Sequence, residues 1–148
     1  MPEPAAGAGY ETLLAFDYGT KKIGIAIGNT LIRQARPLEI LEPPTRAARF
    51  ARVAQLIEEW RPDRLVVGLA LASDGSDQYA TLRCRRFANQ LRGRYGLPVE
   101  LVDERGSSMQ AQAMLPRNAP DDALAAAIIL QRYFDGLAPG PALPSHGS

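Results

Sequence analysis

LLAFDYGTKKIGIAIGN, running from Leu13 to Asn29, is the stretch that decides how this chain folds. An apolar run ends at one carboxylate, Asp17, and the chain then turns through a short segment that contains Gly19. After the turn, isoleucine alternates with glycine or alanine, which is the two-residue period of a strand. Two strands with so short a link form a hairpin. The pattern therefore predicts a hairpin in which an aspartate ends a buried strand.

The remaining pattern predicts a single α/β domain. The expected strands cover residues 12–18, 22–29, 36–42 (an edge strand), 64–69 and 99–102. The expected helices cover residues 45–60, 76–95, 107–115 and 121–134. Excluding the short helix 107–115, the order is β-β-β-α-β-α-β-α. It predicts three antiparallel strands joined to two parallel ones through right-handed crossovers.

Local signals fix parts of the two long central helices. Thr45 is a suitable N-cap, and Pro62 ends that helix. In the helix 76–95 we expect Leu82, Phe87 and Leu91 to point inward, with Cys84 as a buried thiol on the same face.

Composition limits the classes of function. A chain of 148 residues with net charge +1 is neither a polycation nor long enough for several domains. No apolar run approaches the ~20 residues of a membrane span. One cysteine excludes an internal disulfide and a cysteine-based zinc site, so a reducing cytoplasm is the expected compartment.

The two ends of the chain differ from the rest. Residues 1–10 read as a flexible leader and 137–148 as a disordered tail, which leaves residues 11–136 as the domain. The only histidine, His146, lies in the tail, which argues against Ser-His-Asp and Cys-His mechanisms.

Carboxylates gather at the ends of the expected elements. Asp17 ends the first strand, Asp103 and Glu104 end the last, and Asp121 and Asp122 open the last helix. Sites in open α/β sheets form at the carboxyl ends of parallel strands. Clustered carboxylates repel one another, so a cation normally accompanies them, and oxygen ligands suit Mg²⁺ or Mn²⁺. A pair of such ions would support attack of water on a phosphodiester. The alternatives are a simple turn at Asp17 and helix capping at Asp121 and Asp122.

Four motifs in order resemble one family. They are FDYGTKKIGIAIGN from Phe16, VVGL with Asp74-Gly75, Val102-Asp103-Glu104-Arg105, and Asp122-Ala123 with the helix that follows. They are similar to motifs of the Holliday-junction-resolvase-like family of pre-16S ribosomal RNA nucleases. The resemblance covers residues 12–134 and implies an RNase H-like mixed five-stranded sheet flanked by helices.

The resemblance also implies the site. The acidic, metal-binding and catalytic centre would be Asp17, Glu104 and Asp122, with Asp121 as the helix cap. Phosphate contacts would come from Thr20, Lys21, Lys22 and Arg105. The small residues Gly24, Ala26 and Gly28 would let a helix pack closely on the sheet. The segment 115–120 has one arginine where the family carries a longer basic connection, which predicts weak substrate binding.

A second basic element comes from charge alone. No acidic residue lies between Thr81 and Arg94, so we expect this helix, through Arg85 and Arg86, to hold the nucleic-acid backbone. Its alternative is a solvated face.

The expected function is a metal-dependent nuclease of structured RNA that processes pre-16S ribosomal RNA as a monomer or weak homodimer. Branched DNA is the alternative substrate, and a catalytically weak binding or assembly factor is the alternative class. A nucleotide-binding role like that of sugar kinases needs a second Asp-Gly-Thr loop and a longer chain.

Overall fold

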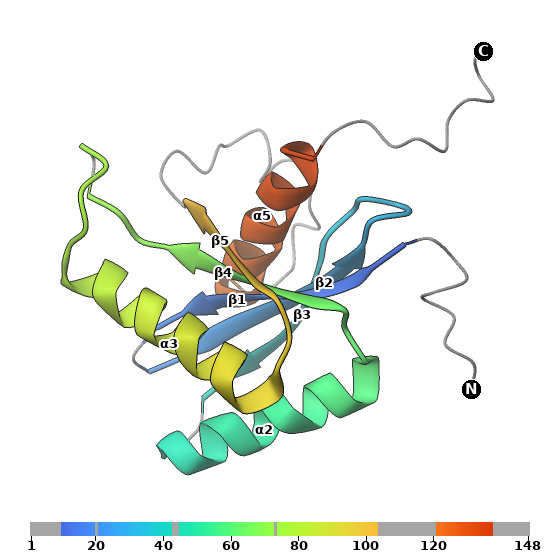
Figure 1. Cartoon of the computed structure of the whole chain (residues 1–148), viewed down its shortest axis with the longest axis horizontal. Helices are drawn as coiled ribbons and strands as arrows, with labels where there is room; N and C mark the ends of the chain where they lie inside the picture. The colour runs from blue at the N-terminus through green and yellow to red at the C-terminus, as the bar shows by residue number, and fades with distance from the viewer. Residues whose placement is uncertain (1–9, 20, 43–44, 73, 104–120, 138–148) are drawn as a thin grey trace.

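The fold is built on one mixed sheet of five strands. The computed structural model describes residues 10–19, 21–42, 45–72, 74–103 and 121–137. The strands are β1 (Thr12–Tyr18), β2 (Ile23–Asn29), β3 (Arg36–Leu41), β4 (Arg64–Leu69) and β5 (Val99–Asp103), in the order β3-β2-β1-β4-β5 (Figure 1). β1, β2 and β3 pair antiparallel, whereas β1, β4 and β5 pair parallel. The predicted element order and the edge position of the third strand are confirmed.

Helices cover both faces of this sheet. Helices α2 (Arg46–Trp60) and α3 (Tyr79–Tyr95) lie on one face and α5 (Asp121–Asp135) on the other (Figure 1). Each face has its own buried apolar cluster. β4 is covered on both sides, since Leu65 through Leu69 are all buried. None of the helices in the described part of the chain is long and apolar enough to cross a membrane.

The hairpin divides its side chains between the two clusters. Ile23, Ile25 and Ile27 enter the cluster beneath α2 and α3, while Ala26 enters the cluster beneath α5. A Cβ at Gly28 would lie 2.8 Å from the ring of Phe134, so only glycine admits this ring. The prediction that the small-residue face receives a closely packed helix is therefore confirmed, and the helix is α5.

Capping explains the bounds of α2. The hydroxyl of Thr45 accepts a hydrogen bond from the Ala48 amide at 3.0 Å, as expected of an N-cap. Arg61 ends the helix in the left-handed region, with φ of 48°, directly before Pro62. Both predicted signals for this helix are confirmed.

The start of α3 differs from the prediction. The helix begins at Tyr79, about three residues later than expected, and Leu82 is 55% exposed rather than inward. Thr81 takes the inward position in the first turn and is buried, and its hydroxyl donates to the carbonyl of Ala70. Phe87, Leu91 and Cys84 are buried as predicted. The expected helix 107–115 and nearly all of the leader and of the tail lie outside the described residues.

Candidate nucleic-acid processing site

Asp17 lies where three parallel strands end together. β1, β4 and β5 run in the same direction, with Phe16 beside Val67, and Gly68 beside Val102. The carboxyl ends of these strands therefore lie together at one end of the sheet, the carboxyl edge (Figure 1). Crossover folds place their sites at this edge, because the connecting loops converge there.

The side chain of Asp17 faces the α5 side of the sheet. Neighbouring residues of a strand point to opposite faces. Leu13 and Ala15 belong to the cluster beneath α5, whereas Leu14 and Phe16 belong to the cluster beneath α2 and α3. Asp17 lies two residues after Ala15, so its side chain points to the same face as those of Leu13 and Ala15. It is partly buried.

Helix α5 brings its first turn to the same edge. The ring of Phe134, near its end, packs against Gly28, which pairs with Leu13 at the start of β1. The preceding turn holds the β2–β3 connection, since Gln131 Oε1 accepts from the Ala35 amide at 3.0 Å. With its last turns at the start of β1, α5 begins at the edge where Asp17 lies (Figure 1). The backbone of Asp121 and Asp122 forms that first turn.

Parity also places the side chain of Asp103, the last residue of β5. Val102 packs against the cluster beneath α5, so Asp103 has the opposite parity to Val102. Glu104, Thr20 and Arg105 lie outside the described residues, as do the side chains of Asp121 and Asp122. Within the described ranges, no group of three acidic, histidine or cysteine side chains is placed to hold a metal ion. The centre of Asp17, Glu104 and Asp122 therefore stays a prediction.

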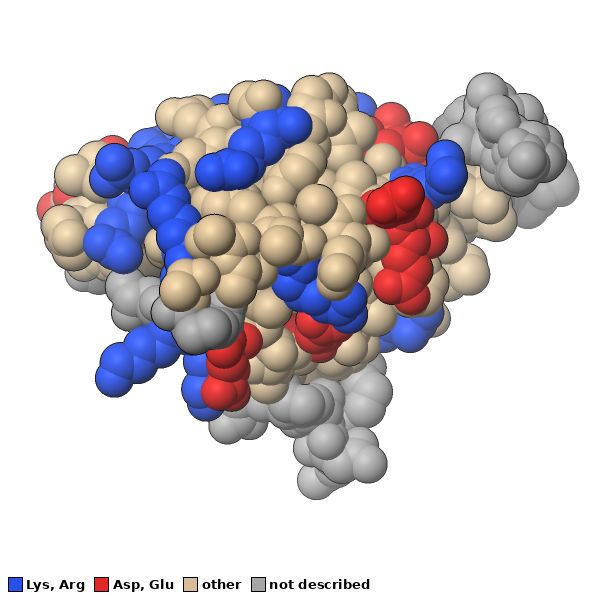
Figure 2. All heavy atoms as spheres, turned by 90° about the horizontal axis from the view of Figure 1, so that it is seen from below, with Lys and Arg blue, Asp and Glu red and all other residues tan. Residues whose placement is uncertain are grey.

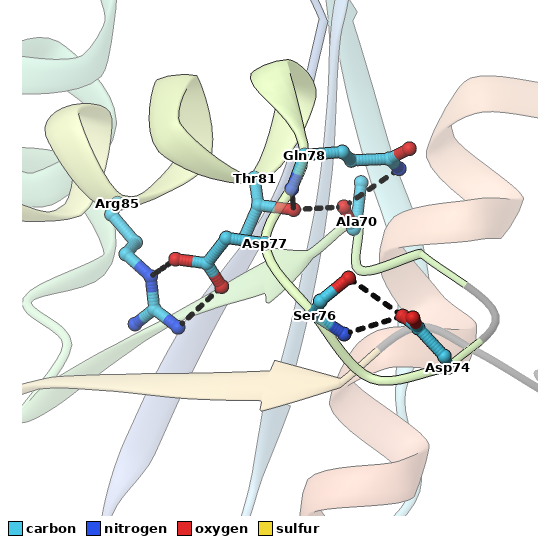
Figure 3. Close-up of polar contacts among 7 residues, drawn as sticks. All are labelled: Ala70, Asp74, Ser76, Asp77, Gln78, Thr81 and Arg85. Carbon is cyan, nitrogen blue, oxygen red and sulfur yellow. Dashed lines mark hydrogen bonds and ion pairs between the residues drawn. The ribbon is translucent and has the colours of Figure 1, made fainter.

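The β4–α3 connection at this edge is tied down by short polar contacts (Figure 3). Gln78 Nε2 donates to the Ala70 carbonyl at 3.0 Å, and its backbone amide donates to Thr81 Oγ1 at 3.0 Å. Asp74 Oδ1 accepts from the amide and the hydroxyl of Ser76, at 2.9 and 2.6 Å. The connection thus leaves the sheet edge in one defined direction.

A pocket lined by arginines lies on the opposite face of the same edge. It has a volume of about 150 Å³ and is lined by Tyr18, Arg46, Arg49, Arg83, Arg86, Phe87 and Gln90. Arg46 and Arg49 come from the first turn of α2, and Arg83 and Arg86 from the first half of α3. Seen from the α2 side, basic side chains gather toward this end of the molecule (left in Figure 2).

Two tyrosines position guanidinium groups around this pocket. Arg49 Nη1 donates to the hydroxyl of Tyr18 at 3.0 Å, and its guanidinium carbon lies 5.3 Å from the centre of that ring. Arg83 Nη1 donates to the hydroxyl of Tyr79 at 3.0 Å. This hydrogen bond is the main cause that raises the pKa of Arg83.

The predicted basic residues fall into different surroundings. Lys21 is exposed, and Lys22 lies 3.8 Å from a carboxylate oxygen of Glu42. Arg85 pairs with Asp77, at 3.1 and 3.2 Å, on the outer side of α3 (Figure 3). Arg86 instead lines the pocket.

Sequence reasoning did not select Arg46 and Arg49. Their signal was the spacing of three residues, shared with Arg83 and Arg86, which places both members of each pair on one helix face. Which two faces meet depends on how α2 and α3 pack.

Comparison with known proteins places the chain in context. A family model described as "RuvX: Holliday junction resolvase" matches residues 11–136. A relative in Bordetella petrii is 75% identical over 86% of this chain and 97% of its own, and one in Bordetella avium is 71% identical over 86% and 98%. Both carry the name "Putative pre-16S rRNA nuclease".

Solved structures share the fold at low sequence identity. RuvC of Thermus thermophilus in complex with a Holliday junction substrate has a TM-score of 0.57 at 20% identity, over 83% of this chain and 92% of that one. Fowlpox virus resolvase with Holliday junction DNA has a TM-score of 0.54 at 13% identity, over 86% and 99%. The predicted RNase H-like architecture, a mixed five-stranded sheet flanked by helices, is confirmed.

Proposed function

Because this chain belongs to the RuvX Holliday junction resolvase family, we propose that it is a metal-dependent nuclease that hydrolyses phosphodiester bonds in structured RNA. The substrate we propose is the precursor of 16S ribosomal RNA, which the names of its close relatives give. The observation that carries the proposal is the place of Asp17. It is a partly buried carboxylate at the carboxyl edge of three parallel strands, on the face where α5 begins.

The donor chemistry at this edge fits a hard divalent cation. Asp17, with Glu104 directly after β5 and Asp122 in the first turn of α5, supplies only carboxylate oxygens, which Mg²⁺ and Mn²⁺ prefer. When bound there, one or two such ions would lower the pKa of water and stabilise charge on the phosphate. Asp17 reaches this position without distorting the strand, because its parity already turns it toward α5.

The basic residues would bind and orient the substrate backbone. Thr20, Lys21 and Lys22 belong to the link between β1 and β2, directly after the edge that carries Asp17, and Arg105 follows Glu104. Exposed ammonium and guanidinium groups hold phosphates without reading bases. Of the two arginines proposed on α3, Arg86 is the stronger candidate, because Arg85 already forms an ion pair with Asp77.

Branched DNA is the second substrate that we propose to test. The family description names Holliday junctions, and structural neighbours bind them. A resolvase of symmetric junctions acts as a dimer, whereas an RNA-processing nuclease can act as the monomer or weak homodimer proposed here. The proposed compartment is the cytoplasm, in keeping with a single, buried cysteine, Cys84, that takes part in no disulfide.

Side-by-side cleavage tests the activity and the substrate together. A ribosomal RNA precursor and a four-way DNA junction are each incubated with Mg²⁺, Mn²⁺ or chelator. We expect metal-dependent cleavage of the RNA, and its loss in Asp17→Asn with an unchanged thermal transition. Asp63→Asn is the matched control, because Asp63 lies just before the start of β4, at the opposite end of the sheet, and an amide oxygen can still accept from the Thr12 amide.

The same experiment can refute the proposal. Cleavage by Asp17→Asn at the wild-type rate would remove Asp17 from the centre. Tight RNA binding with no metal-dependent product would instead identify a binding or assembly factor on this fold. Preferred cleavage of the junction would assign the protein to branched DNA.

A further inference from the structure

The arginine pocket gathers four guanidinium groups, and three of them take part in no ion pair found among the described residues. Four guanidinium groups, from Arg46, Arg49, Arg83 and Arg86, surround a space of about 150 Å³. None of the ion pairs found among the described residues includes Arg46, Arg83 or Arg86. Such a concentration of like charge at one place destabilises the fold unless an anion offsets it.

One buried donor in this pocket has no partner in the described structure. Nε of Arg83 is buried and makes no hydrogen bond there, while Nη1 of the same group is fixed by Tyr79. Buried donors without partners are rare, because each one loses its hydrogen bond to water. An acceptor oxygen entering the pocket would satisfy this donor.

Two of the four arginines are held in place before any ligand arrives, Arg49 by Tyr18 and Arg83 by Tyr79. The rings of Tyr18 and Phe87, which both line the pocket, lie 4.6 Å apart. Guanidinium groups whose orientation is already set lose less conformational entropy when they bind an oxyanion. The first turn of α2, from which Arg46 and Arg49 come, adds the positive end of the helix dipole, which favours anions.

We propose that this pocket binds one phosphate group of the nucleic-acid backbone, on the face of the sheet opposite to Asp17. The inference rests on the proposed function, because it takes the substrate to be a nucleic acid. Tyr18 lines the pocket, whereas Asp17, its neighbour in β1, faces α5. The bound nucleic-acid strand would therefore cross the end of the sheet between the pocket and Asp17. The pocket therefore anchors a phosphate away from the bond that is cut, and it sets where along the strand cleavage falls.

The test separates anchoring from chemistry by working in chelator, where no cleavage occurs. Binding of a fluorescent single-stranded RNA to the full chain is measured at several salt concentrations, for wild type, Arg46→Gln and Arg86→Gln. Both positions are exposed, so these variants should fold. We expect each to bind about tenfold more weakly at low salt, and the slope of log K against log salt to fall by about 0.7, the value of one phosphate contact on a single strand.

Arg61→Gln is the matched control. Arg61 is also an exposed arginine, but it lies at the opposite end of α2, away from the pocket. We expect its affinity and slope to equal those of wild type. Equal affinities and slopes for all four proteins would overturn the proposal.

A second measurement follows the pocket itself. Titration of the full chain with inorganic phosphate in chelator should shift the Nε–H NMR signal of Arg83, and Arg86→Gln should weaken that shift. No shift in wild type would overturn the proposal. A shift together with unchanged RNA binding would also overturn it, because the pocket would then take free phosphate rather than the backbone.

The outcomes remain distinct from those of the proposed nuclease activity. If Arg46→Gln and Arg86→Gln bind RNA like wild type while wild type cleaves it in a metal-dependent way, the nuclease stands without the pocket. Salt-sensitive anchoring without any cleavage would leave the pocket standing and remove the nuclease.

Discussion

Gln131 connects α5 to the far end of the hairpin, and its replacement tests whether that connection orients the helix. Its Oε1 accepts from the Ala35 amide at 3.0 Å, and its Nε2 donates to the Arg33 carbonyl at 3.0 Å. The side chain is 9% exposed, so water cannot readily replace it. Gln131→Leu keeps most of the volume but removes both of these hydrogen bonds, together with a longer one, at 3.3 Å, from Nε2 to Oδ1 of Asp135.

The structure sets the size of the expected loss. A buried group left without its partner costs about 1–3 kcal/mol, so the two groups together lower the free energy of unfolding by about 2–6 kcal/mol. For a domain of this length that corresponds to a decrease in Tm of roughly 6–20 °C. Because α5 carries Asp122 at its other end, metal-dependent cleavage should fall more than the folded fraction does.

Thermal unfolding followed by circular dichroism measures the stability, and hydrogen exchange of the Ala35 amide reports the local bond. Gln34→Leu is the control, since Gln34 is an exposed glutamine in the same connection. Its effect should stay within about 0.5 kcal/mol. A Tm of Gln131→Leu equal to that of the control, with the Ala35 amide still protected, would refute the reasoning.

Three further substitutions test other contacts. Gly28→Ala should lower the free energy of unfolding by about 1–3 kcal/mol by overpacking against the Gln34 carbonyl and the ring of Phe134, as measured in urea; an unchanged midpoint would contradict the close packing. Arg64 donates a hydrogen bond to the Glu11 carboxylate and thereby lowers the pKa of Glu11 in the folded protein. The pair therefore stabilises the fold at pH values above the pKa that Glu11 has in the unfolded chain. This stabilisation is lost as the pH falls through the pKa of Glu11 in the folded protein. Unfolding of Glu11→Gln should therefore depend less on pH below about 4.5, and identical pH profiles would exclude the linkage. Thr81→Val should speed hydrogen exchange in the β4–α3 connection, because the valine cannot donate to a carbonyl there; unchanged exchange would give Thr81 no such role.

The strands and α2 could be predicted from the sequence because their signals are local. The two-residue period of the hairpin, the cap at Thr45 and the stop at Pro62 each act within a few residues. The bounds of β1 and the edge position of β3 follow from them. The prediction that Leu82 points inward was wrong, because the outcome depends on a contact with a residue outside the helix. The inward position in the first turn of α3 belongs to Thr81, whose hydroxyl is a second donor to the Ala70 carbonyl beside Gln78 Nε2.

The candidate site also has one part that local sequence patterns predict and another part that they do not. The strand that ends in Asp17 is a local pattern, whereas joining Glu104 and Asp122 to it relied on the family resemblance. The arginine pocket depends on how two helices pack, and charge density alone pointed to Arg85 as much as to Arg86. One step along a helix turns a side chain by about 100°, which is enough to give one arginine to Asp77 and the other to the pocket.

Asp17 and its neighbour at the end of β1 serve opposite faces of the sheet. Asp17 and Tyr18 are adjacent in β1, so the pleat turns one toward α5 and the other toward α2 and α3. The strand end thus supplies an acidic group to one face and part of a basic pocket to the other. Phosphate repels the first and is attracted by the second, so a nucleic acid held only by the pocket would keep clear of Asp17. A cation shared by the carboxylates reverses the sign on that face. On this reasoning, metal binding lets the backbone reach the acidic side, and it should strengthen RNA binding in wild type but not in Asp17→Asn.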